Sequence, residues 1–346
     1  MKVVFFRHSL LSRGGDKMVL AHAGYLAACG PQVVIVSNVL NTVLDIPIGV
    51  SIEMLSRRGK FGTIISTLAQ RIEAEVIVSD IIAMSLLLSL RNAGRVVYYA
   101  QDYDESYYTS RFMKGLVRLF YLLGLRYFRI PTIAVSEPLA ELLRNRFNAS
   151  VKVAENGVDT KVFYPDPDPE LVKAKEGRKA ILLLSRSDRR KGFDIARDVI
   201  NSMSKSHPGA SEVWTVGEPC TDIFTGVIHR DFGYVAELEL RRIMSSADIF
   251  LYPTRHEGFG LMPLEAFACK CPVVTTMSVP YAVDGKNSFV TAIVDTDALY
   301  KSVVKLIEDP LLADEIVFNG ALCAKESSLE MASVKFAGFL EGFLCH

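Results

Sequence analysis

The sequence predicts an α/β protein with two doubly wound domains, each built on a parallel sheet. The chain has 346 residues, too many for one average domain and enough for two. Short apolar runs rich in β-branched residues alternate with longer helical patterns, and this alternation restarts in the second half of the chain. Because half of the residues are hydrophobic, each domain can bury a sizeable core.

The first half of the chain predicts five buried strands. Continuous apolar runs are typical of parallel strands that are covered on both faces. The expected strands are 2–6, 32–37, 76–80, 95–100 and 132–136, and the expected helices are 16–29, 63–73 and 138–147. Alternating strands and helices favour a sheet with helices on both faces, in which ligands bind beyond the carboxyl ends of the strands.

The second half repeats this pattern. The expected strands are 180–185, 212–217, 248–253 and 271–276, and the expected helices are 191–206, 235–246, 262–269 and 296–308. Between the halves, "FYPDPDPE" has a proline at every second position, which predicts a stiff extended linker. We therefore expect domains at 1–165 and 166–327, with an amphipathic helix in 328–346 that packs back onto the first domain.

Charge and cysteine content narrow the functional classes. The net charge is zero, yet residues 1–150 hold 17 basic and 11 acidic side chains, which indicates an anionic partner for the first half or a chance excess. The six cysteines are scattered, and Cys269-Lys270-Cys271 lacks a second ligand pair, so no metal site is expected. The N-terminal segment has no signal-peptide pattern and the longest apolar run has ten residues, so a cytoplasmic location is expected.

A basic loop follows the first strand of the second half. "SRSDRRKGFD" places Arg186 and Lys191 five positions apart, just before a helix. A guanidinium and an ammonium beside a helix N-terminus suit a diphosphate. The alternative is a solvated basic loop.

A second loop, "RHEGFGLMPLEAF", holds two glutamates. Glu257 ends the loop after a strand, and Gly258 and Gly260 allow backbone amides to approach a ligand. Glu265 lies in the first turns of the helix that follows. Fixed carboxylates suit vicinal hydroxyls. Compensation of the helix dipole is an alternative for Glu265, but it does not explain Glu257.

These motifs resemble retaining GT-B glycosyltransferases, in particular glycosyltransferase family four. The match continues through segments that occur in the same order along the chain: "GG" at 14–15, "VSEPLAELL" at 135–143, "ENGVDTKVF" at 155–163, "VGE" at 216–218, "SSADIFLYP" at 245–253, "CKCPVVTT" at 269–276 and "DGKNSFV" at 284–290. The resemblance is strongest over 130–295. It implies two Rossmann-like domains that face each other across a cleft.

The resemblance also implies a role for each matching residue. Arg186 and Lys191 would hold the diphosphate of a nucleotide-sugar donor, Glu265 the ribose hydroxyls and Glu257 the hydroxyls of the transferred sugar. Gly15 would approach the diphosphate from the first domain. The glycine-rich turn and the helix start would complete the donor site with Gly258, Phe259, Gly260, Leu261 and Met262. No resident cofactor and no metal are implied, because the two cations replace the metal's role at the leaving diphosphate.

The chain departs from the family pattern in two places. Lys270-Cys271-Pro272 stands where the family has Gly-x-Pro, which affects local packing. Many members have a histidine after the fourth strand of the first domain, whereas this chain has Gln101 and Asp102, and in this it resembles a branch that includes rhamnosyltransferases. Asp102 is the candidate base or orienting group for the acceptor hydroxyl; the alternative is a cap of the next helix.

A basic and aromatic stretch at 110–130 has no acidic residue. Its basic residues are Arg111, Lys114, Arg118, Arg126 and Arg129. This composition is typical of an interfacial helix on anionic lipid, and equally of a domain helix with one basic face. Nucleic acid is not expected, because the aromatic residues share the apolar positions and form no stacking platform.

The sequence thus predicts a metal-independent retaining glycosyltransferase of the hexosyltransferase class. It would move a sugar from a nucleoside-diphosphate sugar to a hydroxyl of a glycan or lipid-linked acceptor, in polysaccharide, glycolipid or cell-surface glycan assembly. It would be cytoplasmic or peripheral on the inner face of a membrane. The alternatives are a nucleotide-sugar epimerase of the same fold and a non-catalytic nucleotide-sugar-binding scaffold.

Overall fold

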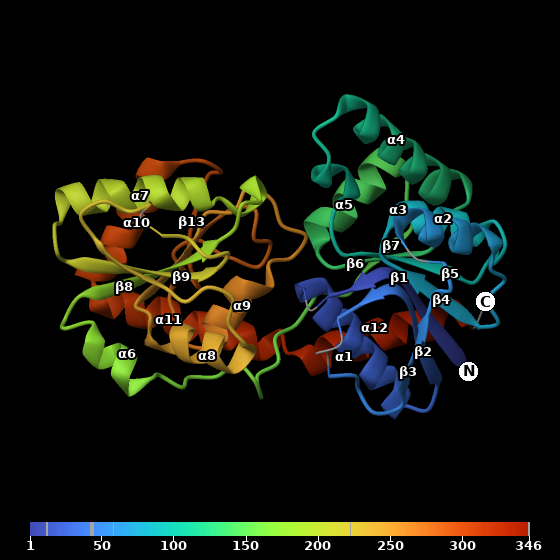
Figure 1. Cartoon of the computed structure of the whole chain (residues 1–346), viewed down its shortest axis with the longest axis horizontal. Coiled ribbons are helices and arrows are strands. Elements are labelled where there is room, and N and C mark those ends of the chain that lie inside the picture. The colour runs from blue at the N-terminus through green and yellow to red at the C-terminus, as the bar shows by residue number, and fades with distance from the viewer. Residues whose placement is uncertain (12, 42–44, 58, 222, 345–346) are drawn as a thin grey trace. The chain divides into compact units, whose positions relative to one another are not determined.

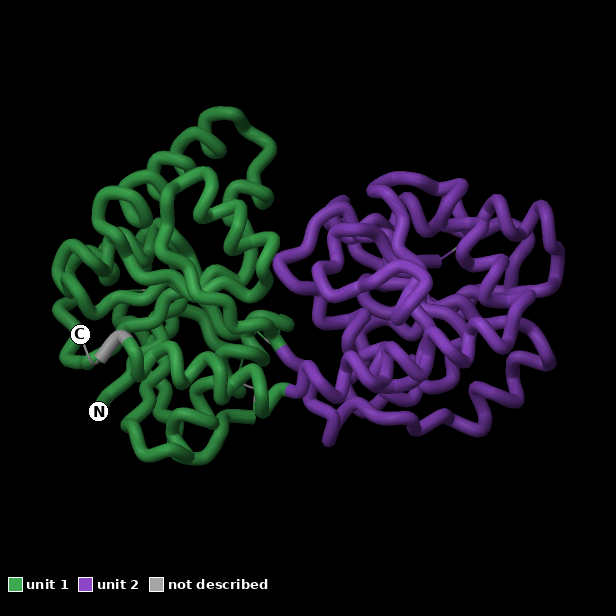
Figure 2. The backbone as a smooth tube through the Cα atoms, turned by 180° about the vertical axis from the view of Figure 1, so that it is seen from behind, with its two compact units in different colours: residues 1–156, 329–346 green, residues 157–328 purple. Residues whose placement is uncertain are grey.

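The computed structural model describes residues 1–344 except 12, 42–44, 58 and 222 (Figure 1). The chain forms two compact units, one of Met1–Asn156 with Leu329–His346 and one of Gly157–Ser328 (Figure 2). The prediction of two parallel-sheet, Rossmann-like α/β domains is confirmed. The first unit ends before the expected boundary at residue 165.

The proline-rich segment is part of the second unit, so the prediction of a stiff linker over 163–170 is wrong. The Asp166 carboxylate pairs with Arg241 at 2.7 Å, and its amide donates to Ser245 Oγ at 3.0 Å. Asp168 caps α6 (Pro169–Ala174) by accepting from the amides of Glu170 and Leu171. The alternating aspartates therefore bind this segment to helix α8 (Glu237–Ser246) and start a helix of their own.

The first unit is built on a seven-stranded parallel sheet of order β3-β2-β1-β4-β5-β6-β7. Its strands are β1 (Lys2–Leu10), β2 (Gln32–Leu40), β3 (Val50–Met54), β4 (Val76–Ser79), β5 (Val96–Ala100), β6 (Thr132–Ala134) and β7 (Val151–Val153). Its helices are α1 (Gly14–Ala28), α2 (Gly59–Ala69), α3 (Ile82–Ser89), α4 (Arg111–Tyr121), α5 (Glu137–Phe147) and α12 (Leu329–Leu344), with a π-helix at Leu122–Tyr127. The strand order reverses between β1 and β4, and ligands bind at such a point in doubly wound sheets.

The second unit has a six-stranded parallel sheet of order β10-β9-β8-β11-β12-β13. Its strands are β8 (Lys179–Ser185), β9 (Ser211–Gly217), β10 (Ile228–Asp231), β11 (Ile249–Tyr252), β12 (Val273–Thr276) and β13 (Phe289–Thr291). Its remaining helices are α7 (Phe193–Ser206), α9 (Leu261–Ala268), α10 (Thr296–Glu308) and α11 (Pro310–Glu326). Here the order reverses between β8 and β11, so the loops after these two strands are neighbours.

The C-terminal helix α12 lies in the first unit, against α1 (Figures 1 and 2). The Phe336 ring stacks on His22 of α1 with centroids 4.2 Å apart, and it also contacts Phe5 and Tyr99. His22 Nδ1 lies 3.0 Å from Ser333 Oγ, and its Nε2 lies 3.2 Å from Tyr99 Oη. Helix α12 therefore completes the hydrophobic core that β1, α1 and β5 form on this side of the sheet.

Candidate functional site

The centre of the candidate site is an ion pair between the two loops at the switch point of the second unit. Lys191 follows β8 and Glu257 follows β11. The Lys191 ammonium lies 2.8 Å from Glu257 Oε1 and 3.0 Å from Oε2. The Glu257 side chain is only 8% exposed and that of Lys191 is 27% exposed, so the pair is shielded from bulk water but still reachable.

Two hydroxyls complete the surroundings of the Glu257 carboxylate. Tyr252 Oη, at the end of β11, donates to Oε1 at 2.5 Å, and Thr254 Oγ1 lies 3.1 Å from the same oxygen. Burial, followed by the charge of Glu257, raises the pKa of Tyr252 well above 10, so its hydroxyl keeps its proton. Sequence reasoning missed Tyr252; the signal was a tyrosine at the end of a central buried strand.

Hydrogen bonds from Arg255 hold the two loops together. Its guanidinium donates to the carbonyl of Arg189 at 2.7 Å and pairs with Asp194 at 2.6 Å. Its backbone amide donates to the Arg190 carbonyl. Hydrogen bonds from Arg255 lower the pKa of Asp194. Gly192 has φ +74°, and a Cβ there would overlap the Pro253 carbonyl. The Lys191 loop therefore keeps its place only with a glycine after it.

The glycine-rich turn forms the start of α9. Gly260 is the N-cap, with φ +86°, and the Tyr281 hydroxyl donates to its carbonyl. Phe259 is buried and packs on Tyr281 with ring centroids 4.8 Å apart. Leu261 and Met262 are half-buried in the first turn of α9, where backbone amides lack helical partners. This arrangement suits close approach of a ligand to the backbone.

Glu265 lies inside α9 and is buried, at 5% exposure. After burial, the charges of Glu257 and Glu265 both contribute to raising the pKa of Tyr252 and of Tyr281 well above 10.

Arg186 is exposed at the end of β8. Its guanidinium lies over the Tyr234 ring at 5.4 Å from the centroid, and no carboxylate of the described residues lies within 4.0 Å of it. The loop is fixed beside it, because the Ser187 amide donates to Glu218 at 2.8 Å. The Arg186 guanidinium is therefore exposed beside an aromatic ring. Sequence reasoning missed Tyr234, an exposed aromatic residue in a loop.

The corresponding loops of the first unit gather around Gly15, the second residue of α1. A Cβ at Gly15 would overlap the side chain of Gln101, which donates to Asp80 Oδ2 at 3.3 Å. Asp80 follows β4 and pairs with the buried Arg7 at 2.5 Å, and Arg7 also pairs with Asp16 at 2.7 Å. Arg7 and Asp80 were not predicted, although charged residues in or directly after buried strands signal such a site.

Asp102 follows β5 and is half-buried, and its Oδ1 accepts from the Tyr103 amide at 2.7 Å. The alternative of a helix cap does not apply to Asp102, because Tyr103 is the N-cap of the short helix Asp104–Tyr107. Asp104 takes that kind of role instead: its Oδ2 accepts from the Ile82 amide at the start of α3. Burial raises the pKa of Asp104 to about 7, and the charges of Asp80 and Asp102 add to the shift.

No group of three or more side chains in the described part of the chain is arranged to hold a metal ion.

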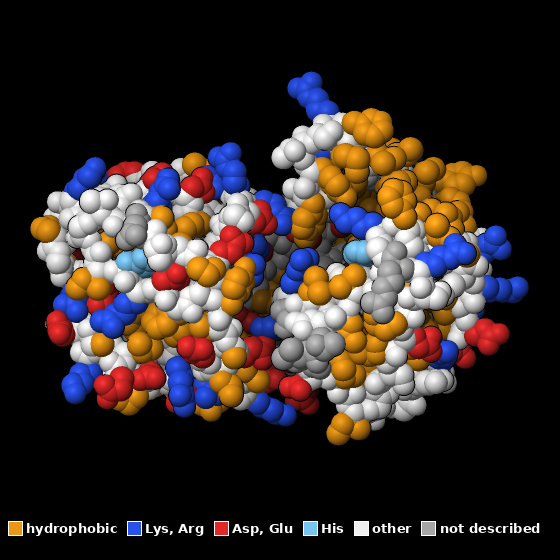
Figure 3. All heavy atoms as spheres, in the orientation of Figure 1, with side chains coloured by type: hydrophobic (Ala, Val, Ile, Leu, Met, Phe, Trp, Pro, Cys, Tyr) orange, Lys and Arg blue, Asp and Glu red, His pale blue; other side chains and the backbone are white. Residues whose placement is uncertain are grey.

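The basic stretch forms α4 and the π-helix. Arg118 pairs with the buried Glu105 at 2.5 Å, so one of its five cations belongs to the fold. Large apolar side chains beside them are exposed: Phe112 at 78%, Tyr127 at 77% and, on α2, Phe61 at 84%. Figure 3 shows hydrophobic side chains gathered on the face of the first unit that carries α4. Among the helices described, none is long and apolar enough to cross a membrane.

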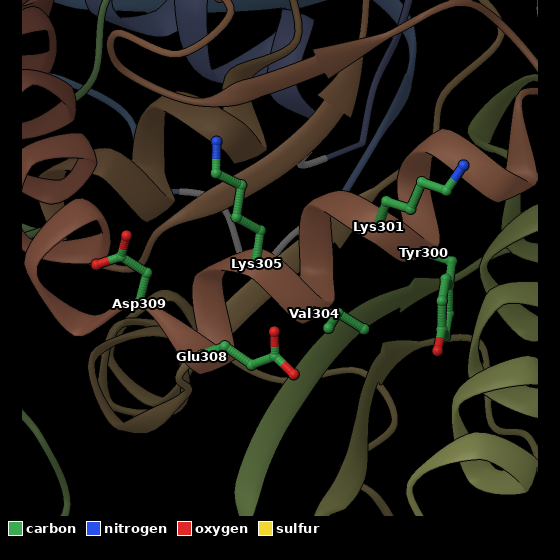
Figure 4. A pocket seen from close by; sticks show the side chains of 6 residues that line it. All are labelled: Tyr300, Lys301, Val304, Lys305, Glu308 and Asp309. Carbon is green, nitrogen blue, oxygen red and sulfur yellow. The ribbon is translucent and has the colours of Figure 1, made fainter.

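A separate surface groove lies on α10 (Figure 4). It is lined by Tyr300, Lys301, Val304, Lys305, Glu308 and Asp309. None of the predicted site residues lines it.

Comparisons with known proteins find relatives of the second unit. Residues 178–309 match the family model described as "Glycosyl transferases group 1". A GDP-mannose-dependent alpha-(1-6)-phosphatidylinositol monomannoside mannosyltransferase from Mycolicibacterium smegmatis is 30% identical over 47% of this chain and 48% of its own length. The lipopolysaccharide core biosynthesis mannosyltransferase LpcC from Rhizobium leguminosarum bv. viciae is 26% identical over 46% of this chain and 51% of its own length. The chain thus spans about half the length of the curated relatives it matches.

The fold has close counterparts among solved structures. A sucrose-phosphate synthase from Thermosynechococcus elongatus superposes with a TM-score of 0.83 at 15% identity, covering 100% of this chain and 99% of that one. At this identity the likeness concerns the fold alone, and it confirms the GT-B architecture expected from the sequence.

Proposed function

We propose that the chain transfers a hexose from a nucleoside-diphosphate sugar to an acceptor hydroxyl, with retention, because residues 178–309 match the model of the group 1 glycosyl transferases. The observation that carries the proposal is the shielded Lys191–Glu257 pair at the switch point of the second unit. Such a pair offers a cation to a diphosphate and a carboxylate to sugar hydroxyls within one contact distance.

The charged donor residues and the start of α9 each have a role in this scheme. Arg186 and Lys191 neutralise the departing diphosphate, and the amides of Leu261 and Met262 add the N-terminus of α9. Glu265 accepts hydrogen bonds from the ribose hydroxyls, and Glu257 accepts them from the hydroxyls of the transferred sugar. Because two cations and a helix end carry the leaving-group charge, the reaction needs no metal ion.

The acceptor side belongs to the first unit. Asp102 orients or deprotonates the attacking hydroxyl, and Gly15 brings the start of α1 to the diphosphate. The two mannosyltransferases in the comparison have names that place them in phosphatidylinositol mannoside and lipopolysaccharide synthesis, which favours a glycolipid or cell-surface glycan acceptor here.

A lipid-linked acceptor explains the exposed apolar residues of α2, α4 and the π-helix. We propose that this face contacts the surface of an anionic membrane. Phe112 and Tyr127 would enter the interface while Arg111, Lys114 and Arg126 contact lipid phosphates.

Binding of the donor tests the core of the proposal. The measurement is a thermal shift in EDTA against nucleoside diphosphates and their sugars, for the wild type and for Arg186→Ala and Lys191→Ala. We expect stabilisation by one nucleotide family in the wild type and its loss in both variants. Lys301→Ala, in the groove on α10, is the matched control and keeps the shift. Stabilisation that is unchanged in both site variants would contradict the assignment.

Product analysis separates the alternatives. A labelled donor sugar should appear in an added glycolipid acceptor, and Glu257→Ala should abolish this transfer. Conversion of the donor sugar without any acceptor would support the epimerase, and donor binding with neither product would support the scaffold.

Sedimentation with vesicles tests the membrane surface. Full-length protein should bind phosphatidylglycerol vesicles more tightly than phosphatidylcholine vesicles, with affinity that falls as salt rises. Phe112→Ser with Tyr127→Ser should weaken binding. Phe318→Ser, which changes a 70% exposed phenylalanine of α11, should not. Equal binding by both variants would rule out this face.

A further inference from the structure

Glu257 is held by an unequal set of hydrogen-bond donors on its two oxygens. Oε1 receives Tyr252 Oη at 2.5 Å and Lys191 Nζ at 2.8 Å. Thr254 Oγ1 lies 3.1 Å from Oε1, but its nearest acceptor is the Arg190 carbonyl at 2.9 Å. Oε2 receives Lys191 Nζ at 3.0 Å as its one partner among the described residues. A carboxylate oxygen has two lone pairs, so Oε1 is saturated and Oε2 has room for another donor.

Tyr252 is the most rigid of these donors. It is 3% exposed and ends β11, a central strand of the sheet, where its ring lies beside Phe250. Thr275 of β12 donates to its carbonyl at 2.7 Å, so backbone and ring are both fixed. Lys191, by contrast, has a long flexible side chain in a half-buried loop.

We infer that Tyr252 is a positioning residue for sugar recognition: by occupying Oε1 it fixes the Glu257 rotamer and presents Oε2 to one hydroxyl of the transferred sugar. This inference rests on the proposed function. The inference also gives Lys191 two partners. Its ammonium donates to Glu257 and still has N–H capacity for the diphosphate.

If so, Tyr252 should affect the binding of the sugar part of the donor and not that of its diphosphate part. Among the described residues, Tyr252 makes no hydrogen bond to Arg186 or to the loop 187–190 but donates one to Glu257, so it acts on the ligand through Glu257. Loss of its hydroxyl should weaken recognition of the sugar and leave recognition of the diphosphate intact. If Tyr252 were needed only for folding, loss of its hydroxyl would affect sugar recognition and diphosphate recognition alike.

The test compares the affinity of nucleoside diphosphate with that of the matching nucleoside-diphosphate sugar by isothermal titration, on full-length wild type and Tyr252→Phe. Phenylalanine keeps the buried ring. We expect the sugar nucleotide to bind about tenfold more weakly to Tyr252→Phe, as for the loss of a hydrogen bond to a charged group, and the diphosphate to bind within about twofold of wild type. In turnover, the KM for the donor should rise more than kcat falls.

Tyr98→Phe is the matched control. Tyr98 is also fully buried, and its hydroxyl lies 3.1 Å from the Tyr121 hydroxyl in the first unit. It should leave both affinities unchanged. Equal weakening of both ligands by Tyr252→Phe would overturn the inference, as would no weakening of either. A wild type that binds neither ligand would refute the proposed function itself, and the inference would fall with it.

Discussion

At the scale of single residues, the Lys191–Glu257 pair makes a stability prediction that needs no ligand. Lys191→Met leaves the Glu257 carboxylate, 8% exposed, without its cation, and an unsatisfied buried acceptor costs about 1–3 kcal/mol of unfolding free energy. Adding Glu257→Gln removes the uncompensated charge and should restore part of the loss. Urea unfolding of the two single variants and the double variant gives the coupling energy. Strictly additive effects would show that the two side chains do not interact.

A second prediction concerns Asp104 and the pH dependence of the unfolding free energy. Its pKa in the fold is raised to about 7 from 3.8, so between about pH 4 and pH 7 the folded state holds a proton that the unfolded state has released. Its contribution to the unfolding free energy therefore falls as pH rises through this window. His22 acts in the opposite direction, because burial lowers its pKa to about 3 and its contribution rises with pH up to about 6.5.

Asp104→Asn removes the first of these contributions. Relative to wild type, the variant should therefore gain unfolding free energy as pH rises from 5 to 7, by up to about 1.4 kcal/mol per pH unit. Urea unfolding at several pH values measures this. Asp314→Asn, at an exposed aspartate of α11, should follow the wild type. Parallel curves for Asp104→Asn and wild type would mean that Asp104 is ionised in the fold throughout this range.

Residue patterns in the sequence predicted the charged residues of the site better than their supports. Arg186, Lys191 and Glu257 follow strands in short loops, and Glu265 lies in the helix that begins after one of these loops. Position after a strand is readable from sequence. Arg7 and Asp80 meet through a contact between strands that are distant in the chain, and one sequence does not encode which strands are neighbours. Tyr252 ends a buried strand, where the sequence pattern predicts only a core residue, although its hydroxyl reaches Glu257 in the following loop. The roles assigned to these residues stay predictions.

At the scale of elements, the loop between β8 and α7 depends on the backbone of Gly192. Both Gly192 and Gly177 have positive φ, but only at Gly192 would a Cβ overlap a backbone carbonyl, that of Pro253. Gly192→Ala should therefore displace Lys191, weaken nucleoside diphosphate binding at least tenfold, and destabilise the fold more than Gly177→Ala. Gly177→Ala should cost about 1 kcal/mol through strain alone and leave binding intact. Titration and urea unfolding of the two variants check this, and equal effects would contradict it.

The elements themselves were largely readable. All nine expected strands are present, because continuous apolar runs mark buried parallel strands. The strands that were missed, β3, β7, β10 and β13, are short, and the first three expose part of their length. Helix α11 was also missed; its apolar positions form no strong stripe, since Leu311, Phe318 and Leu322 are exposed.

At the scale of the whole molecule, the boundary between the two units follows the packing and lies at Asn156–Gly157, not at the proline-rich segment. Prolines at 165, 167 and 169 suggested a linker, but their aspartate neighbours bind α8. On the second-unit side of the division, Val158 donates to the carbonyl of Ser327 at 2.9 Å and forms a bridge with Ser328. A proline-rich segment resembles a linker in composition, and only its side-chain partners reveal that it is part of a domain.

This division predicts which fragments fold. Residues 157–328 form a continuous unit and should unfold cooperatively when produced alone, whereas residues 1–156 lack α12 and would expose Phe5, His22 and Tyr99, which Phe336 covers. Joining 1–156 to 329–346 through a Gly/Ser linker should restore cooperative unfolding. The measurement is thermal unfolding by circular dichroism, with nucleoside diphosphate added. If the second unit holds the donor, the ligand raises the Tm of 157–328 and leaves that of the joined first unit unchanged. Cooperative unfolding of 1–156 at the Tm of the joined form would show that α12 is dispensable.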